Sequence, residues 1–547
     1  MDGICWWGVM SEKLERLSKL FDLPANRRMI AELGEAHIKL VKKYSFQPML
    51  RQHLKRLIKG SLIYGVGGFF TKFISILILP LFTFYLTPKD YGVMSMLNFL
   101  VIFLSTLFSF GLGTAIGICY FDQKDEKHKN QTISQAFIIL FFGSLLMLIL
   151  GIIFIEPINR ILFPLDNYKK LIILTLVGTA FTNILTPFIL KLQFEENQKR
   201  FIILSAVSTF TAALLSILFV ILFKKGIAGM VEAKLISNIL SFLIFLIPAI
   251  QVISLKVNLL GIKNLFRHGL PMIPSFFALY ILQQGNFYIL AHQHNALDAV
   301  GLYAIAVSFA SPMLLLVSAF QTAWLPFFLS FSQKQQEAQV LISRVMKYYV
   351  LFGGLISLLF YLFAKPMFAL LVNPNFYIAY PVVGLIATAY LLIGIFSILL
   401  PSMYYAKEVK YVTYIQTLTA TLFVFMSFLL TLKLGIIGAG IALIFGYLLM
   451  DILLILWNKL RFRQHKYLPI IYAWRQLLTF IGMYILFVII IFKLHRFSKS
   501  TELIYSFTMF SLILMLSIFL LSKTERNVFI NAIKIKWNSI IISKKTL

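Results

Sequence analysis

The chain has 547 residues, of which 60% are hydrophobic, and its formal net charge is +29 at pH 7. A soluble protein of this length would divide into several domains, but here the apolar residues form runs of about 20, which is the length that crosses a bilayer core. The Lys and Arg residues lie between these runs and not on one soluble module, so the charge does not indicate a nucleic-acid partner. These properties predict an all-α, polytopic membrane protein.

The first segment, residues 1–59, differs from the rest of the chain because it carries mixed charges. Apolar residues such as Leu14, Leu17 and Leu20 recur in it at helical spacing. We interpret it as a basic, amphipathic segment on the cytoplasmic membrane surface, serving either to dock a partner enzyme or only to hold anionic lipids. Its first ten residues lack the basic region and cleavage site of a signal peptide, and none is expected.

The apolar runs that follow predict about fourteen membrane helices, because lipid offers the backbone no hydrogen-bond partner outside its own helix. The predicted helices are residues 61–86, 91–119, 132–155, 170–190, 201–223, 227–250, 269–291, 298–329, 346–364, 376–402, 411–432, 435–457, 474–492 and 502–521. They divide the rest of the chain into a first lobe (60–250), a cytoplasmic linker (251–268), a second lobe (269–458), two added helices (474–521) and a basic cytoplasmic tail (522–547).

Landmarks of the first lobe return about 209 residues later in the second lobe, which predicts two parallel six-helix repeats. The run from Asp90 to Gly92 opens one long apolar helix, and the run from Asp298 to Tyr303 opens another. Further along, Gly226-Ile227-Ala228-Gly229 matches Gly435-Ile436-Ile437-Gly438. Parallel repeats build two-lobed transporters whose substrate site lies between the lobes.

The loop charges predict the orientation. Placing the N-terminus inside gives about 37 Lys and Arg on the inner side and about 11 on the outer side, so both termini are expected in the cytoplasm. Cys5 and Cys119 then lie on the reducing side, and neither a disulfide nor a metal site is expected.

Several short motifs occur in an order that resembles one transporter family. They are Gly60-Ser61, Leu79-Pro80-Leu81, Leu86-Thr87-Pro88-Lys89-Asp90-Tyr91-Gly92, Gly111-Leu112-Gly113, Tyr120-Phe121, Gly269-Leu270-Pro271-Met272-Ile273-Pro274, Gly301-Leu302-Tyr303 and Asn375-Phe376-Tyr377-Ile378-Ala379-Tyr380-Pro381-Val382-Val383. Over residues 55–460 the chain resembles the polysaccharide and oligosaccharide-lipid flippases of the multidrug/oligosaccharidyl-lipid/polysaccharide (MOP) exporter superfamily.

This resemblance implies a transporter that moves an undecaprenyl-pyrophosphate-linked sugar repeat unit to the outer leaflet of a bacterial inner membrane, for O-antigen, capsule or exopolysaccharide assembly. It also implies a polysaccharide polymerase and a chain-length regulator as partners. The chain departs from the family at one place. Where relatives often carry an Asp-Arg pair in the seventh helix, it has Asn286-Phe287, so a role for that charge pair is in doubt here.

Three ionisable residues inside predicted helices are candidates for lining a polar cavity. Lys72 lies about eleven residues, or roughly 16 Å, inside the first helix, which is deeper than a lysine side chain reaches to the surface. Glu232 and Lys234 lie nearer the end of the sixth helix, where both can also serve only as interfacial residues. Being two apart, these two residues face different sides and are not expected to pair.

Polar and aromatic residues of the seventh and eighth helices complete the candidate cavity. Gln283, Gln284 and Asn286, with Gln321 and Trp324, suit sugar binding, but buried amides also hold membrane helices together. Asp451, near the inner end of the twelfth helix, is interpreted as an interfacial anchor. Asp90 and Asp298 are expected to cap their helices.

Other functions remain open at this stage. A multidrug or cation antiporter of the same superfamily would need acidic residues in its lobes, and a flippase for the peptidoglycan lipid precursor would move a cargo with the same lipid pyrophosphate. A membrane-embedded polymerase would need carboxylates gathered at one site, whereas the 21 acidic residues are scattered. The protein is therefore not expected to be an enzyme. No cofactor is expected, and coupling to a proton or a sodium gradient stays open.

Overall fold

The structure, a computed structural model, is helical throughout the residues that it describes, with no strand among them. These are residues 74, 78–195, 198–250, 258–293, 297–329, 331, 335–406, 408, 410–462, 474–494 and 508–511. The predicted N-terminal segment (1–59), Lys72, most of the first and last predicted helices and the predicted tail (522–547) lie outside them.

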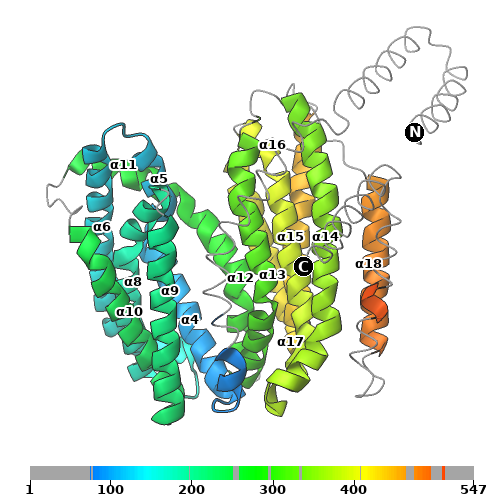
Figure 1. Cartoon of the computed structure of the whole chain (residues 1–547), viewed down its shortest axis with the longest axis horizontal. Helices are drawn as coiled ribbons and strands as arrows, with labels where there is room; N and C mark the ends of the chain where they lie inside the picture. The colour runs from blue at the N-terminus through cyan, green and yellow to red at the C-terminus, as the bar shows by residue number, and fades with distance from the viewer. Residues whose placement is uncertain are drawn as a thin grey trace, which may run out of the picture. The chain divides into compact units, whose positions relative to one another are not determined.

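The first helix group contains the segment that was predicted as the first lobe (Figure 1). Its elements are α4 Pro88–Phe108, α5 Leu112–Phe121, α6 Glu126–Ile153, α7 Ile155–Leu162, α8 Lys169–Phe194, α9 Gln198–Ile217, η1 Leu218–Leu222, α10 Gly226–Ile250 and α11 Leu259–Gly269. The central helix is α8, which packs against α4, α5, α6, α7, α9 and α10. Side chains on this helix are therefore placed to form the interior of the group.

The second helix group follows directly along the chain. Its elements are η2 Leu270–Met272, α12 Ile273–His292, α13 Leu297–Leu329, α14 Gln335–Leu371, η3 Pro374–Ala379, α15 Tyr380–Leu399, α16 Pro401–Tyr405, α17 Lys410–Phe462 and α18 Trp474–Leu494. Here α15 is the most buried helix, packed against α13, α14 and α17. The added helix α18 packs on α14.

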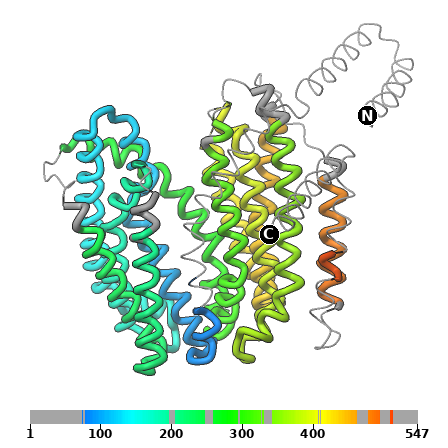
Figure 2. Tube along the Cα trace, in the orientation of Figure 1, coloured from blue at the N-terminus to red at the C-terminus, as the bar shows by residue number. Residues whose placement is uncertain are grey.

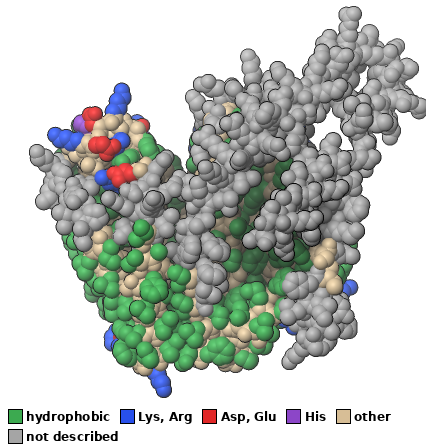
Figure 3. All heavy atoms as spheres, in the orientation of Figure 1, with side chains coloured by type: hydrophobic (Ala, Val, Ile, Leu, Met, Phe, Trp, Pro, Cys, Tyr) green, Lys and Arg blue, Asp and Glu red, His purple; other side chains and the backbone are tan. Residues whose placement is uncertain are grey.

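The described part of the chain contains ten helices that are long and apolar enough to cross a membrane. Hydrophobic side chains cover the visible side of the first group, and charged side chains gather at its ends (Figure 3). This surface is suited to contact with lipid. The predicted second to thirteenth spans all coincide with described helices, some of them broken or joined to a neighbour. The first and last extend outside the described residues, so the number fourteen stays a prediction.

One expectation about helix boundaries was wrong. The predicted helix 91–119 is broken between α4 and α5, where Phe110 and Gly111 adopt positive φ angles of 51° and 70°. A Cβ atom on Gly111 would lie 2.1 Å from the carbonyl oxygen of Gly269, so the break lets two backbones touch. The predicted linker 251–268 contains α11, whose Leu265 is buried in the core formed with α5.

The two groups meet where α4 and α13 begin. A Cβ atom on Gly92 would lie 2.0 Å from the carbonyl oxygen of Leu297. A Cβ atom on Gly301 would lie 1.8 Å from the carbonyl oxygen of Pro88. Only glycine permits this approach, as is common where membrane helices cross closely. The traces of α4 (blue) and of α12 and α13 (green) lie side by side in Figure 2, in agreement with their packing.

The start of α4 is fixed by a capping box and not by Asp90 alone. Thr87 is the N-cap, its backbone N–H donates to Asp90 Oδ2 at 2.9 Å, and its Oγ1 accepts from the Asp90 backbone N–H. This reciprocal arrangement satisfies two backbone donors that the first helical turn would leave unpaired. Asp298 lies in the first turn of α13, as expected of a residue near a helix start.

The two predicted repeats share one turn in detail. Gly226 and Gly435 both have a φ of 55°, a left-handed conformation that glycine adopts without strain. Three residues later, Gly229 and Gly438 each approach the backbone of the preceding helical segment. The similar turns agree with a duplication, which itself stays a prediction.

Candidate functional site

Polar side chains recur at helical spacing on two helices that face each other in the first group. On α8, Thr175, Thr179 and Thr182 lie three or four residues apart, and on α10 the same spacing joins Lys234 to Asn238. Residues at this spacing share one face of a helix. Because α8 and α10 pack together, the two polar faces meet inside the group.

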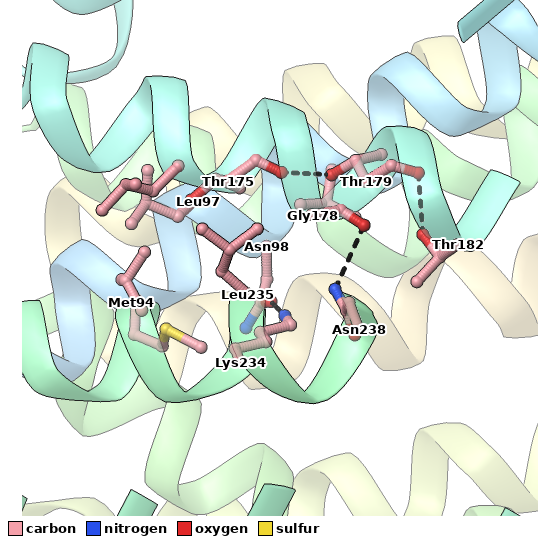
Figure 4. Close-up of a pocket in the computed structure, with 13 residues that line it drawn as sticks. Met94, Leu97, Asn98, Thr175, Gly178, Thr179, Thr182, Lys234, Leu235 and Asn238 are labelled. Carbon is pink, nitrogen blue, oxygen red and sulfur yellow. Dashed lines mark hydrogen bonds between the residues drawn. The ribbon is translucent and has the colours of Figure 1, made fainter. Parts of the chain in front are cut away.

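A pocket of about 100 Å³ lies where these faces meet α4 (Figure 4). Its lining combines apolar side chains with Asn98 of α4, the α8 threonines, and Lys234 and Asn238 of α10. The volume has room for several water molecules, and the lining offers them polar partners. A pocket with polar lining within a membrane-spanning group is a feature expected of a transport pathway.

Lys234 brings a positive charge to this pocket. Its Nζ donates a hydrogen bond to Asn98 Oδ1 at 2.6 Å, which joins α10 to α4 (Figure 4). Among the described residues, no carboxylate forms an ion pair with Lys234. The side chain therefore points into the pocket and not toward the membrane surface, and its charge is available to an anionic group.

The neighbouring polar groups are held in place by the helix backbone. Asn238 Nδ2 donates to the carbonyl oxygen of Gly178 at 3.2 Å, and the hydroxyl groups of Thr179 and Thr182 donate to the carbonyls of Thr175 and Thr179. Each threonine oxygen keeps free lone pairs, and each amide keeps a second N–H donor. The pocket thus presents both donors and acceptors around one ammonium group.

Glu232 does not belong to this pocket. Its carboxylate accepts a hydrogen bond from Lys225 Nζ at 2.6 Å, and both side chains are partly exposed. The expectation that Glu232 and Lys234 do not pair is confirmed, since each has a different partner.

Asn286 lies in the second group and is fully used in packing. It is 1% exposed, donates to Tyr303 Oη and to the carbonyl of Ala439, both at 2.9 Å, and accepts from Ser427 Oγ at 2.6 Å. These bonds tie α12 to α13 and to both halves of α17. On the same helix, Gln283 is exposed and Gln284 is half-buried.

Gln321 and Trp324 hold α13 against α15. Gln321 Nε2 donates to Ser397 Oγ at 2.7 Å, and Trp324 Nε1 donates to the Ser397 carbonyl at 2.8 Å. Trp324 is only 1% exposed and stacks on Phe320. The structure therefore gives these two residues a packing role. A role for them in sugar binding stays a prediction, as does any role of Lys72.

The interpretation of Asp451 as an interfacial anchor was wrong, because the structure buries this side chain to 3% exposure. The prediction also missed Asn98 and the polar face of α8. The threonine spacing on α8 was the available signal, since Thr175, Thr179 and Thr182 recur at helical spacing in an otherwise apolar run. Asn98 gave no periodic signal, because its partner is 136 residues away along the chain.

Several solved structures share this fold. An inward-facing multidrug resistance MATE family transporter of the MOP superfamily has a TM-score of 0.62 and 14% identity, covering 75% of this chain and 98% of its own. The lipid II flippase MurJ has a TM-score of 0.57 and 16% identity, covering 83% and 98%. The MATE transporter VcmN of Vibrio cholerae has a TM-score of 0.52 and 17% identity, covering 77% and 99%.

No curated protein matches the chain in sequence. The sequence profile of the family described as "Polysaccharide biosynthesis protein" matches residues 57–332, which is half of the chain and contains the whole pocket. The protein shares its fold with MATE transporters and MurJ, and with this match over half of its length it belongs to the polysaccharide biosynthesis protein family.

Proposed function

We propose that this chain is a flippase that moves an undecaprenyl-pyrophosphate-linked oligosaccharide repeat unit, for O-antigen, capsule or exopolysaccharide, from the cytoplasmic to the outer leaflet of a bacterial inner membrane. Membership of the polysaccharide biosynthesis family and a multi-pass helical fold shared with transporters support it. The structural likeness supports the fold alone, so the cargo has to be argued from the site.

The observation that carries the proposal is the ammonium of Lys234, which lines a polar pocket, bonds to Asn98 and has no carboxylate partner among the described residues. A lipid pyrophosphate is anionic and has to leave water to cross hydrocarbon, so a half-buried cation with hydrogen-bond donors beside it stabilises it. A lysine binds phosphate as a point charge, and Asn98 and Asn238 supply neutral donors beside it.

The size of the pocket limits what it holds. Pockets that enclose a whole small ligand are typically about 300–1,000 Å³, whereas this one is about 100 Å³. We therefore infer that the pocket holds a phosphate-sized part of the cargo, and that the oligosaccharide lies outside it during the same step.

Movement of the cargo requires the site to open to each side in turn. The two helix groups touch through α4, α12 and α13, and the Gly92 and Gly301 contacts lie at one end of this interface. Transporters of this construction move one lobe against the other around a fixed site. We propose the same movement here, with both termini in the cytoplasm and with a polymerase and a chain-length regulator as downstream partners.

The test is genetic complementation in a strain that lacks the gene and has no redundant flippase. Wild-type protein is expected to restore surface polysaccharide, while Lys234→Gln is expected to leave the lipid-linked repeat unit accumulated inside the cell. Lys225→Gln is the matched control, because Lys225 is an exposed lysine of the same group that pairs with Glu232. It is expected to restore polysaccharide fully.

The result also separates the other functions. Full rescue by a stably expressed Lys234→Gln would show that transport does not need the pocket charge. Normal polysaccharide in the deletion strain would show that the protein is not the flippase for this polysaccharide. Increased drug sensitivity would then point to a multidrug antiporter, and loss of viability with accumulated peptidoglycan precursor would point to a precursor flippase.

A further inference from the structure

Among the described residues of the second helix group, Asp451 is the one buried carboxylate-bearing residue. Asp451 is on α17, about 24 Å beyond Gly435 and about 16 Å before the helix ends, at 1.5 Å per residue. Its side chain is 3% exposed. Ionisable residues at such a position in a membrane helix are rare and commonly belong to ion or proton pathways.

This carboxylate lacks the partners that a buried charge requires. Among the described residues, neither Asp451 oxygen has a hydrogen-bond partner, and no lysine or arginine forms an ion pair with it. Two further buried hydroxyl groups of α17, Tyr447 Oη one turn away and Thr419 Oγ1, also have no hydrogen-bond partner in the part of the chain that the structure describes. An ionised, unpaired carboxylate is strongly disfavoured in such surroundings, whereas a protonated one is tolerated.

Within the described part of the chain, the ionisable groups near Asp451 and Tyr447 are tyrosines. Tyr349 of α14 lies near Asp451 but donates its hydroxyl to the Leu391 carbonyl at 3.1 Å, and Tyr390 of α15 and Tyr303 of α13 lie near Tyr447. Tyrosines of the other two neighbours point elsewhere. On α12, Tyr280 donates to the Phe99 carbonyl of α4.

On α16, the other neighbour of α17, Tyr404 packs on Phe328 of α13 and Tyr405 donates to the Phe328 carbonyl. No cationic group among the described residues therefore compensates a charge on Asp451. A proton is the simplest species that does so, since it needs only the carboxyl group and one acceptor.

We propose that Asp451 is a proton-binding site that couples transport to the proton gradient. Its carboxylate takes up one proton from water on one side of the membrane, is buried as a neutral acid, and releases that proton to water on the other side. The coupling rests on the proposed transport function, whereas proton binding by Asp451 does not.

Carbodiimide labelling tests proton binding without any substrate. Dicyclohexylcarbodiimide reacts with protonated carboxyl groups in apolar surroundings, and mass spectrometry of the purified full chain locates the adduct. We expect Asp451 to be labelled at pH 7, with labelling that falls as the pH rises and that sodium does not prevent. Glu232 is an internal control that is expected to stay unlabelled, because it is paired with Lys225 and partly exposed.

Two labelling results would overturn the proposal. An unlabelled Asp451 across the pH range would show that the group is not a buried acid. Protection by sodium at constant pH would show a cation site in place of a proton site. Neither result requires a variant, so a folding defect cannot obscure it.

Coupling is tested in vesicles that contain the purified protein and a pH-sensitive dye. Addition of lipid-linked oligosaccharide is expected to start proton flux with wild type and with Asp451→Glu, and at least tenfold less flux with Asp451→Asn. Equal flux with Asp451→Asn would overturn the coupling. If wild type moves no lipid-linked sugar but Asp451 still shows pH-dependent labelling, the proposed function fails while the proton site stands.

Discussion

The two helix groups use the polar side chains between their helices differently. In the first group, Lys234 and Asn98 bond to each other at the edge of a pocket, and the hydroxyl groups around them keep free lone pairs. In the second group, Asn286 is enclosed by Tyr303, Ser427 and Ala439 and keeps no room for a ligand. The same residue types therefore bind helices together in one place and leave a site open in another.

The difference shows that the number of satisfied bonds, and not the residue type, separates a packing role from a binding role. It also yields four variants whose expected effects on stability decrease in order. The first two remove packing bonds, the third removes the pocket charge, and the fourth changes an exposed pair that serves as a baseline.

Asn286→Leu is expected to destabilise the protein most. The change removes three hydrogen bonds, each worth about 0.6 kcal/mol on average in a membrane helix bundle, and strands two buried hydroxyl groups. We expect a loss of about 2–3 kcal/mol in the free energy of unfolding, measured in detergent with a chemical denaturant. Gln283→Leu, on the exposed face of the same helix, is the control, and equal stability of the two variants would contradict the packing role.

Trp324→Phe is expected to cost about 1 kcal/mol, because it removes one buried hydrogen bond to Ser397 and keeps most of the aromatic packing. The same denaturation measurement checks this value. Transport by the variant should stay near the wild-type level, since Trp324 is only 1% exposed. A strong transport defect in a stable Trp324→Phe protein would show that this residue acts in the site.

Lys234→Gln is expected to have the opposite effect to Trp324→Phe, because it should reduce transport and leave stability nearly unchanged. Its stability should change by less than about 1 kcal/mol, because glutamine still bonds Asn98, while transport falls about tenfold or more, equivalent to about 1.4 kcal/mol of lost binding. A flux assay and a denaturation curve on the same preparation measure both. A large stability loss with normal flux would place Lys234 with Asn286 as a packing residue.

Glu156→Gln is expected to have the smallest effect. The hydrogen bond from Lys169 lowers the pKa of the Glu156 carboxyl, and Arg160 adds a smaller contribution in the same direction. Because the folded pKa is the lower one, the pair stabilises the protein above the unfolded pKa of about 4.3 and loses this contribution as the pH falls. Melting temperatures of variant and wild type should differ slightly at pH 7 and converge in acid, and a difference that persists in acid would contradict the assignment.

The apolar runs predicted the helices well because lipid imposes the same requirement on every span. The break at Phe110 and Gly111 was not predictable, since it depends on the contact with Gly269, far along the chain. The structure places Lys234, a predicted site residue, in the pocket. The sequence alone could not show that Lys234 lines the pocket whereas Asn286 serves packing. This distinction depends on which side chains, distant along the chain, bond to each residue.

The contact between Gly301 and the Pro88 carbonyl also limits how the protein can deform. With no space for even a methyl group at this crossing, the helices can tilt about it more easily than they can slide. The helix α13 extends beyond Gly301 for about 42 Å, so a tilt of about 10° displaces its far end by about 7 Å. A small change of angle at the two glycine contacts therefore moves the far end of α13 by a distance that is large enough to open a passage for a sugar.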